Sequence, residues 1–138
     1  MNQGRGVAAG LAVVVAVAVG LSYTDLTDDG GTPHVSDGIP DCMSGELPTT
    51  TVQVVDDIEQ GGPFDYPGND GGTFRNDEEL LPDKPRGYYR EYTVDTPGSP
   101  DRGARRIVTG GFDTDDPELW FFTDDHYDSF CELAPDMG

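Results

Sequence analysis

Half of the basic residues in this chain lie close together, although the chain as a whole carries a formal net charge of -19. The chain has eight Lys and Arg residues, and four of them are Arg90, Arg102, Arg105 and Arg106. A basic cluster in so acidic a chain indicates a bound anion. Glu91 lies in the same stretch, and His126 follows within the segment 124–127 (DDHY). A carboxylate, an imidazole and several guanidinium groups at one site could cleave a phosphodiester through proton transfer and charge stabilisation, without a metal.

The length and composition of the chain limit the kind of fold that can position these residues. A chain of 138 residues can hold one modest domain with a single core, plus a tail. The acidic excess is compatible with disorder, but six Tyr, six Phe and one Trp, together with β-patterned segments, favour a fold. We expect the charge to be an adaptation to molar salt, which shortens the screening length to about 3 Å, and hence expect a halophilic source.

The first 41 residues have the composition of an export signal followed by a linker. Arg5 precedes an uncharged apolar run at 7–21, and Ala18-Val19-Gly20 resembles a small-x-small cleavage site. Residues 1–21 are therefore predicted to be a signal peptide or, alternatively, a membrane anchor, although a spanning helix needs about 20 apolar residues. Residues 22–41 read as an acidic flexible linker. We expect the folded domain at 42–138 to be extracellular or held on the outer face of the cell membrane.

Two cysteines flank the predicted domain. Cys42 and Cys131 are too far apart in the sequence for a C-x-x-C metal pair. In an exported chain a disulfide between them is the simplest interpretation, and two buried free thiols are the alternative. A loop of this length would stabilise the fold by roughly 4 to 5 kcal/mol in the chain-entropy model.

The patterns between the cysteines predict one helix and several strands. The helix opens at Leu47-Pro48, carries an apolar stripe of Val52, Val55 and Ile58, and ends at the Gly61-Gly62-Pro63 breaker. Segments punctuated by Gly and Pro follow at 71–74, 88–94, 105–109, 120–123 and 127–133, and they read as antiparallel strands. One helix followed by strands indicates an α+β fold.

Several segments, in order and spacing, closely resemble the microbial guanyl-specific ribonucleases, the barnase-like group that includes the small secreted actinomycete enzymes. The resemblance covers roughly residues 42–133. It is carried by the segments 62–66 (GPFDY), 74–78 (FRNDE), 81–82 (LP), 87–94 (GYYREYTV), 96–98 (TPG), 102–107 (RGARRI) and 125–127 (DHY). It implies the fold of that family, in which one N-terminal helix packs on a twisted antiparallel sheet of about five strands.

The resemblance implies a metal-independent endoribonuclease that cleaves single-stranded RNA 3' to guanosine through a 2',3'-cyclic phosphate, which is then hydrolysed. Glu91 matches the family's general base and His126 its general acid, and the two exchange roles in hydrolysis. From the residues alone, Glu91 could instead form a cross-strand ion pair with an arginine. His126 could instead be a solvated surface histidine.

The arginines divide by their match to the family. Arg102 and Arg106 match its phosphate-clamping pair, for which the bidentate guanidinium is suited. Arg105 could contact substrate or pair with one of the many aspartates. Arg90 stands where relatives often carry histidine, and we assign it to substrate binding.

The segment 74–78 matches the family's guanine-recognition loop. Glu78 matches the glutamate that accepts hydrogen bonds from the guanine N1 and 2-amino groups, while Asn76 and Asp77 supply backbone amides to O6. Asp77 departs from the arginine that relatives commonly have, so it places a second negative charge beside Glu78. Arg75, where relatives carry a small polar residue, supplies a nearby cation. Tyr127 is expected to hydrogen-bond the phosphate or wall the base site, with structural packing as the alternative.

Other classes of function remain open at this point. The chain could be an inactive relative that binds RNA or a protein through the same arginines, or a ribonuclease toxin. Two histidines and two distant cysteines give no metal-ligand spacing, so we expect neither a metal nor another cofactor. The expected partners are single-stranded RNA and an inhibitor protein, and the expected state is a monomer.

Overall fold

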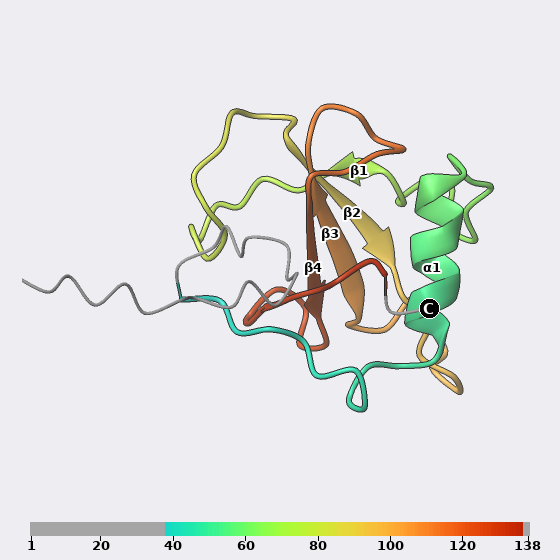
Figure 1. Cartoon of the computed structure of the whole chain (residues 1–138). Helices are drawn as coiled ribbons and strands as arrows, with labels where there is room; N and C mark the ends of the chain where they lie inside the picture. The colour runs from blue at the N-terminus through green and yellow to red at the C-terminus, as the bar shows by residue number, and fades with distance from the viewer. Residues whose placement is uncertain (1–37, 137–138) are drawn as a thin grey trace, which may run out of the picture. The chain divides into compact units, whose positions relative to one another are not determined.

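The structure, a computed structural model, describes residues 38–136 of the chain (Figure 1). These residues belong to one compact unit, Thr32–Gly138. The predicted signal peptide or anchor at 1–21 and the predicted linker as far as residue 37 lie outside the described residues. Over residues 38–136, no helix is both long enough and apolar enough to cross a bilayer.

One helix precedes a five-stranded sheet in the described part of the chain. The helix is α1 (Thr50–Glu59), and the strands are β1 (Gly72–Thr73), β2 (Tyr89–Thr93), β3 (Arg106–Gly110), β4 (Leu119–Thr123) and β5 (Cys131–Glu132). The strands lie in the sheet in their sequence order, and every neighbouring pair is antiparallel. Figure 1 labels β1 to β4. The predicted α+β architecture is confirmed.

The predicted fifth strand is wrong over most of its length. Residues 127–133 were expected to be extended, but β5 contains only Cys131–Glu132. Its expected first half is a turn, in which Tyr127 adopts a positive φ of 74°. A residue in that conformation cannot continue a strand. Tyr127 therefore lies in a turn and not in a strand.

The helix ends at the predicted glycines, in a Schellman motif. Beyond the last helical residue, the N–H of Gly61 donates to the carbonyl of Ile58 at 3.0 Å, and the N–H of Gly62 donates to that of Asp57 at 2.7 Å. Gly61 has a φ of 75°, which glycine adopts without a steric penalty. Pro48 lies two residues before the helix rather than in its first turn, and its carbonyl accepts a hydrogen bond from Thr51.

The buried face of the helix differs from the predicted stripe. Val55 and Ile58 are buried as expected, but Val52 is 42% exposed and Thr51 is 1% exposed. The buried positions are thus spaced i, i+4 and i+7, which is the periodicity of one helix face. The sheet selects this face, because Val55 and Ile58 pack with Tyr92 and Val94 of the sheet core.

The sheet has an apolar cluster on each face. The cluster against the helix contains Val55, Ile58, Tyr92, Val94, Ile107, Trp120, Phe122 and Leu133. The cluster on the opposite face contains Leu81, Tyr88, Tyr89, Val108, Leu119 and Phe121. Because side chains alternate along a strand, Glu91 and Thr93 lie on the same face as Tyr89. Glu91 and Thr93 therefore lie on the face away from the helix, whereas Arg90 lies on the helix side.

The predicted disulfide is present, and it joins the chain before the helix to the last strand. Cys42 and Cys131 are bonded with their Cα atoms 4.9 Å apart. Next to the bond, the N–H of Cys42 donates to the carbonyl of Glu132, and the N–H of Glu132 donates to that of Pro40, each at 2.8 Å. The predicted linker at 22–41 therefore ends too late, because Asp41 bridges Glu132 and Ile39 packs against the second apolar cluster.

The helix face can be tested with two valines. Replacing Val55, which is 5% exposed, with alanine removes buried methyl groups, and we expect unfolding free energy to fall by about 1–3 kcal/mol. Val52→Ala should change it by less than about 0.5 kcal/mol. Urea denaturation of both variants measures the difference, and equal losses would contradict the assigned face.

The disulfide closes a loop of 89 residues. The chain-entropy model therefore gives it about 4.6 kcal/mol of stability at 25 °C. We expect the unfolding free energy of the double variant Cys42→Ala/Cys131→Ala, measured by chemical denaturation, to fall by most of this amount. A variant as stable as the parent chain would show that the link constrains the unfolded state very little.

Candidate active site

Glu91 and Arg106 meet on the sheet face that the helix leaves open. Arg106 on β3 is directly opposite Thr93 on β2, so Glu91 is its diagonal cross-strand neighbour. The Oε2 atom of Glu91 lies 3.8 Å from Nε of Arg106, and the two side chains are 20% and 4% exposed. Arg106 is anchored by Nη1, which donates to the carbonyls of Gly103 and Arg105 at 2.9 and 2.7 Å.

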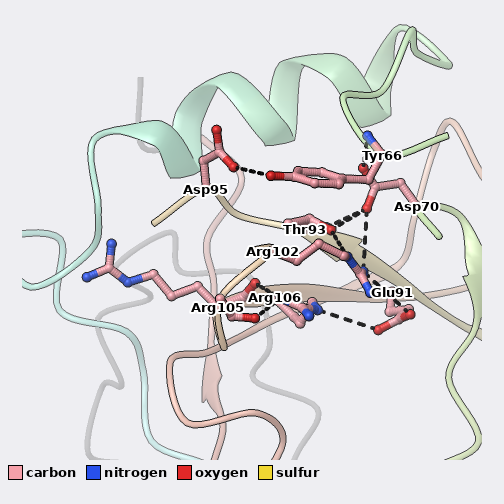
Figure 2. A network of polar contacts seen from close by, with 9 residues as sticks. Tyr66, Asp70, Glu91, Thr93, Asp95, Arg102, Arg105 and Arg106 are labelled. Atoms are coloured by element: carbon pink, nitrogen blue, oxygen red, sulfur yellow. Dashed lines mark hydrogen bonds and ion pairs between the residues drawn. The ribbon is translucent and has the colours of Figure 1, made fainter. Parts of the chain in front are cut away.

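Arg102 approaches the same carboxylate from the loop between β2 and β3. Its Nη2 atom lies 3.8 Å from Oε1 of Glu91, and Figure 2 shows the guanidinium groups of Arg102 and Arg106 beside that carboxylate. The loop turns at Gly103, which has a φ of 64°. A Cβ at this position would come within 2.6 Å of Thr96 Oγ1, so the turn that presents Arg102 requires glycine.

Both guanidinium groups retain a buried N–H without a partner. Nη2 of Arg102 and Nε of Arg106 have no hydrogen bond to any described residue, because 3.8 Å to Glu91 is too long for one. Burial lowers the pKa of Arg106 and the neighbouring Arg102 lowers it further, while Glu91 raises it. Two adjacent cations with unused donors are suited to an anion with several oxygens, such as a phosphate.

Asp70 and Thr93 position Arg102, and sequence reasoning missed both. Asp70 Oδ1 accepts hydrogen bonds from the N–H and the hydroxyl of Thr93, each at 2.7 Å. The Thr93 hydroxyl in turn accepts from Nε of Arg102 at 3.0 Å. The Tyr66 ring lies 5.8 Å from the guanidinium carbon, and its hydroxyl donates to Asp95 (Figure 2). No sequence signal distinguishes Asp70 from the other aspartates beside glycine.

His126 is carried by the turn after β4. Its side chain is exposed, and its backbone has a φ of 57°. Its N–H donates to the carbonyl of Ala104 at 3.3 Å, which ties the turn to the loop that holds Arg102. The structure therefore brings His126 to the same side of the molecule as the two site arginines.

These residues line one cleft of about 550 Å³. Glu91, Arg102 and His126 lie in its wall together with Thr73, Phe74, Arg75, Asn76, Asp77, Glu78, Leu80, Tyr127, Asp128 and Phe130. A second, more open hollow of about 370 Å³ shares Arg102 and His126 with it and includes Arg106. The predicted catalytic and base-recognition residues therefore border connected space.

The predicted recognition loop is closed by the side chain of Asn76. Its Nδ2 donates to the carbonyl of Leu81 at 2.9 Å, and its Oδ1 accepts from the N–H of Leu81 at 3.0 Å. Asn76 has a φ of 52°, a conformation that asparagine tolerates better than most residues. The Asn76 side chain is thus used for loop structure, which leaves backbone groups and the exposed Glu78 to face the cleft.

Arg75 and Asp77 form an ion pair on the rim of this loop. Nε of Arg75 lies 3.4 Å from Oδ1 of Asp77, with side chains 70% and 67% exposed. The pair partly offsets the charge that Asp77 adds beside Glu78. Such an exposed pair is weak, about 0–1 kcal/mol, so Arg75 can be recruited by a ligand.

Aromatic rings form one wall of the cleft. Tyr127 packs against Phe74, with ring centroids 4.9 Å apart and planes inclined by 31°, and Phe74 contacts Phe130 at 5.8 Å. Tyr127 also contacts the imidazole of His126, at 4.9 Å between centroids. Tyr127 is therefore both packed and part of the cleft.

Two of the four clustered arginines, Arg90 and Arg105, line neither the cleft nor the adjoining hollow. Arg90 lies on the helix side of β2, and its Nη1 donates to the carbonyl of Gly71 at 3.0 Å. Its assignment to substrate binding is not supported by this placement, because alternation along β2 sends Arg90 and Glu91 to opposite faces. The side chain of Arg105 points away from Glu91 (Figure 2).

Within residues 38–136, no group of three or more His, Cys, Asp and Glu side chains is arranged to hold a metal ion. The side-chain donors that line the cleft include the nitrogens of Arg75, Arg102 and His126 and the hydroxyls of Thr73 and Tyr127. Their chemistry is that of anion binding and proton transfer.

The sequence matches those of known ribonucleases. The profile of the ribonuclease family matches residues 32–134. Guanyl-specific ribonuclease St of Saccharopolyspora erythraea is 46% identical over 93 residues, which are 67% of this chain and 86% of that protein. Guanyl-specific ribonuclease Sa3 of Kitasatospora aureofaciens is 52% identical over 89 residues, which are 64% of this chain and 59% of that protein.

Solved structures agree with the sequence matches. Ribonuclease Sa2, in complexes with mononucleotides, superposes with a TM-score of 0.62 and 41% identity, covering 70% of this chain and 95% of that chain. Its complex with guanosine-2'-cyclophosphate gives a TM-score of 0.61 and 40% identity, covering 71% and 98%. From the fold, the cleft and these matches together, the chain belongs to the microbial guanyl-specific ribonuclease family.

Proposed function

We propose that this chain is an endoribonuclease that cleaves single-stranded RNA 3' to guanosine in two steps without a metal. The observation that carries the proposal is a pair of buried guanidinium N–H groups without hydrogen-bond partners, each 3.8 Å from the Glu91 carboxylate. Arg102 and Arg106 also line the hollow that His126 shares with the cleft. A phosphate bound by Arg102 and Arg106 would lie beside a base and close to an acid.

In the first step the ribose 2'-oxygen attacks the adjacent phosphorus. Glu91 removes the 2'-hydroxyl proton as the new O–P bond forms, and the bond from phosphorus to the 5'-oxygen breaks. His126, as imidazolium, gives its proton to that leaving oxygen. Each such proton transfer typically contributes about 10²–10⁴-fold to the rate.

The arginines act on the charge that develops on phosphorus. Nη2 of Arg102 and Nε of Arg106 have unused donors, and they can bond to the non-bridging oxygens as these gain negative charge. The Asp70–Thr93 pair holds Arg102 in place beforehand, so little reorganisation is needed during the reaction.

In the second step water opens the 2',3'-cyclic phosphate. His126 now accepts the water proton and Glu91 returns its proton to the 2'-oxygen, which leaves a 3'-phosphate. Ribonuclease Sa2 has been solved with guanosine-2'-cyclophosphate and with 3'-GMP, and these ligands correspond to an intermediate and a product of this sequence.

Guanine would be bound by the loop that Asn76 closes. Glu78 accepts from the two adjacent donors of guanine, N1 and the 2-amino group, and backbone N–H groups of the loop meet O6. Adenine lacks that pair of donors, so it would leave the carboxylate desolvated without partners. The aromatic wall of Phe74 and Tyr127 offers the base an apolar surface.

We further propose that the chain acts outside the cytosol. The Cys42–Cys131 disulfide supports this, because such bonds persist mainly in oxidising compartments. Secretion of the intact chain by its producing cell, followed by mass determination of the mature protein, tests export and cleavage near residue 20 together.

The central test is digestion of an RNA that contains one guanosine, in EDTA, by the oxidised protein. We expect cleavage 3' to the guanosine with a cyclic phosphate accumulating first, as read by mass spectrometry. Glu91→Gln should lower the rate by about 10²–10⁴-fold, whereas Glu59→Gln, at the end of the helix, serves as the matched control and should be unchanged. A folded wild-type protein that binds this RNA without cleaving it would instead favour a binding module.

The charge of the recognition loop gives a second test. Asp77→Asn frees Arg75 from its ion pair and removes a charge beside Glu78. We expect the KM for a guanylyl dinucleotide to fall about two- to fivefold with kcat unchanged. Asp83→Asn removes a charge from the exposed loop that follows and should leave KM unchanged. An equal fall in both variants would indicate long-range repulsion of RNA rather than a local effect.

A further inference from the structure

The turn that presents His126 holds an unfavourable backbone conformation. His126 and Tyr127 are consecutive residues other than glycine, with φ of 57° and 74°. A residue other than glycine is strained in this conformation, and it persists there only where its surroundings enforce it. The surroundings of this turn therefore determine where the imidazole lies.

One carboxylate bonds to both ends of that turn. Oδ1 of Asp125 accepts from the Thr123 hydroxyl and from the Ser129 N–H, each at 2.9 Å. Its Oδ2 accepts from the Ser129 hydroxyl. The Thr123 hydroxyl also accepts from the N–H of Tyr127 at 3.1 Å. Asp125 thus links the last residue of β4 to a residue beyond His126.

From this network we infer that Asp125 is a positioning residue for the proposed acid, holding the His126 turn through Thr123 and Ser129 so that the imidazole faces the scissile phosphate. The inference rests on the proposed function. Asp125 does not itself touch the substrate in this role, because its oxygens are occupied by the turn.

The network requires an acceptor at Asp125. Partial burial by itself raises the pKa of Asp125, but hydrogen bonds from Ser129 and Thr123 outweigh it and lower the pKa below its usual range. The group is therefore ionised wherever the enzyme would work at neutral pH, and a carboxylate without a proton can accept all three bonds.

The negative charge of Asp125 is the competing explanation for an effect of Asp125 on His126, because Asp124 and Asp125 both precede His126. Either carboxylate could act on the imidazole through space. Only Asp125 takes part in the hydrogen bonds of the turn, whereas Asp124 is an exposed neighbour of equal charge. Asp124→Ala is therefore a matched control that removes the same charge and leaves the network in place.

The experiment compares Asp125→Ala, Asp125→Asn, Thr123→Val and Asp124→Ala on two substrates, below the melting temperature of every variant. One is a guanylyl-(3'→5') dinucleotide, whose leaving 5'-oxygen needs a proton. The other is guanosine 3'-(p-nitrophenyl phosphate), whose leaving group departs as the anion. His126→Ala is the reference for complete loss of the acid.

For the dinucleotide we expect Asp125→Ala to lower kcat about 10- to 100-fold, since a displacement of about 1 Å can cost 10²-fold, with KM within twofold. Thr123→Val, which keeps the charge, should also lower kcat, and Asp125→Asn should recover part of the loss because its amide oxygen still accepts. Asp124→Ala should stay within twofold. On the p-nitrophenyl ester all four variants should match the wild type within about threefold.

Equal losses in Asp124→Ala and Asp125→Ala would overturn the inference in favour of charge. An unchanged kcat in Asp125→Ala, or a loss of the same size on the ester, would also overturn it. If His126→Ala itself loses as much on the ester as on the dinucleotide, the acid role of His126 fails, and with it the proposed mechanism. The failure of the positioning role is thus distinguishable from the failure of the proposed function.

Discussion

The active cleft depends on three charges that are close together but not hydrogen-bonded to one another. Glu91 lies 3.8 Å from a nitrogen of each site arginine. Direct hydrogen bonds would satisfy the buried donors and leave none for a bound anion, while wider separation would leave the carboxylate without a neighbouring counter-charge. The rest of the structure maintains this intermediate separation: β2 and β3 fix Glu91 and Arg106 by register, and Thr93 fixes Arg102.

Periodicity and turn residues predicted the central elements because they express local constraints. Strands β2, β3 and β4 appear close to their expected bounds, and the Gly61-Gly62 stop is a complete Schellman motif. The prediction of the buried helix face was wrong. Val55 and Ile58 belong both to the predicted stripe, which adds Val52, and to the observed one, which adds Thr51. Hydrophobicity alone favours Val52 over Thr51. Only packing against the sheet decides between them.

For similar reasons, some residues of the site were predicted from the sequence and others were missed. Glu91, Arg102, Arg106 and His126 come together as expected. Alternation along β2 could have placed Arg90 on the face away from Glu91, because neighbouring residues in a strand face opposite ways. Asp70 was not predictable, since its role depends on a contact with Thr93, 23 residues further along the chain. The start of the strand predicted at 127–133 lies instead in the turn that Asp125 closes, because its aromatic residues favoured a strand in the sequence.

Because the two faces of β2 have different surroundings, they limit where the chain can tolerate insertions and deletions. Tyr92 belongs to the core beneath the helix, whereas Glu91 faces the cleft. One residue inserted or deleted within this strand would exchange the faces, placing a carboxylate in the apolar core and an aromatic ring among the arginines. The loop between β3 and β4 carries no such alternation, so natural variation in length should concentrate there and be absent from β2.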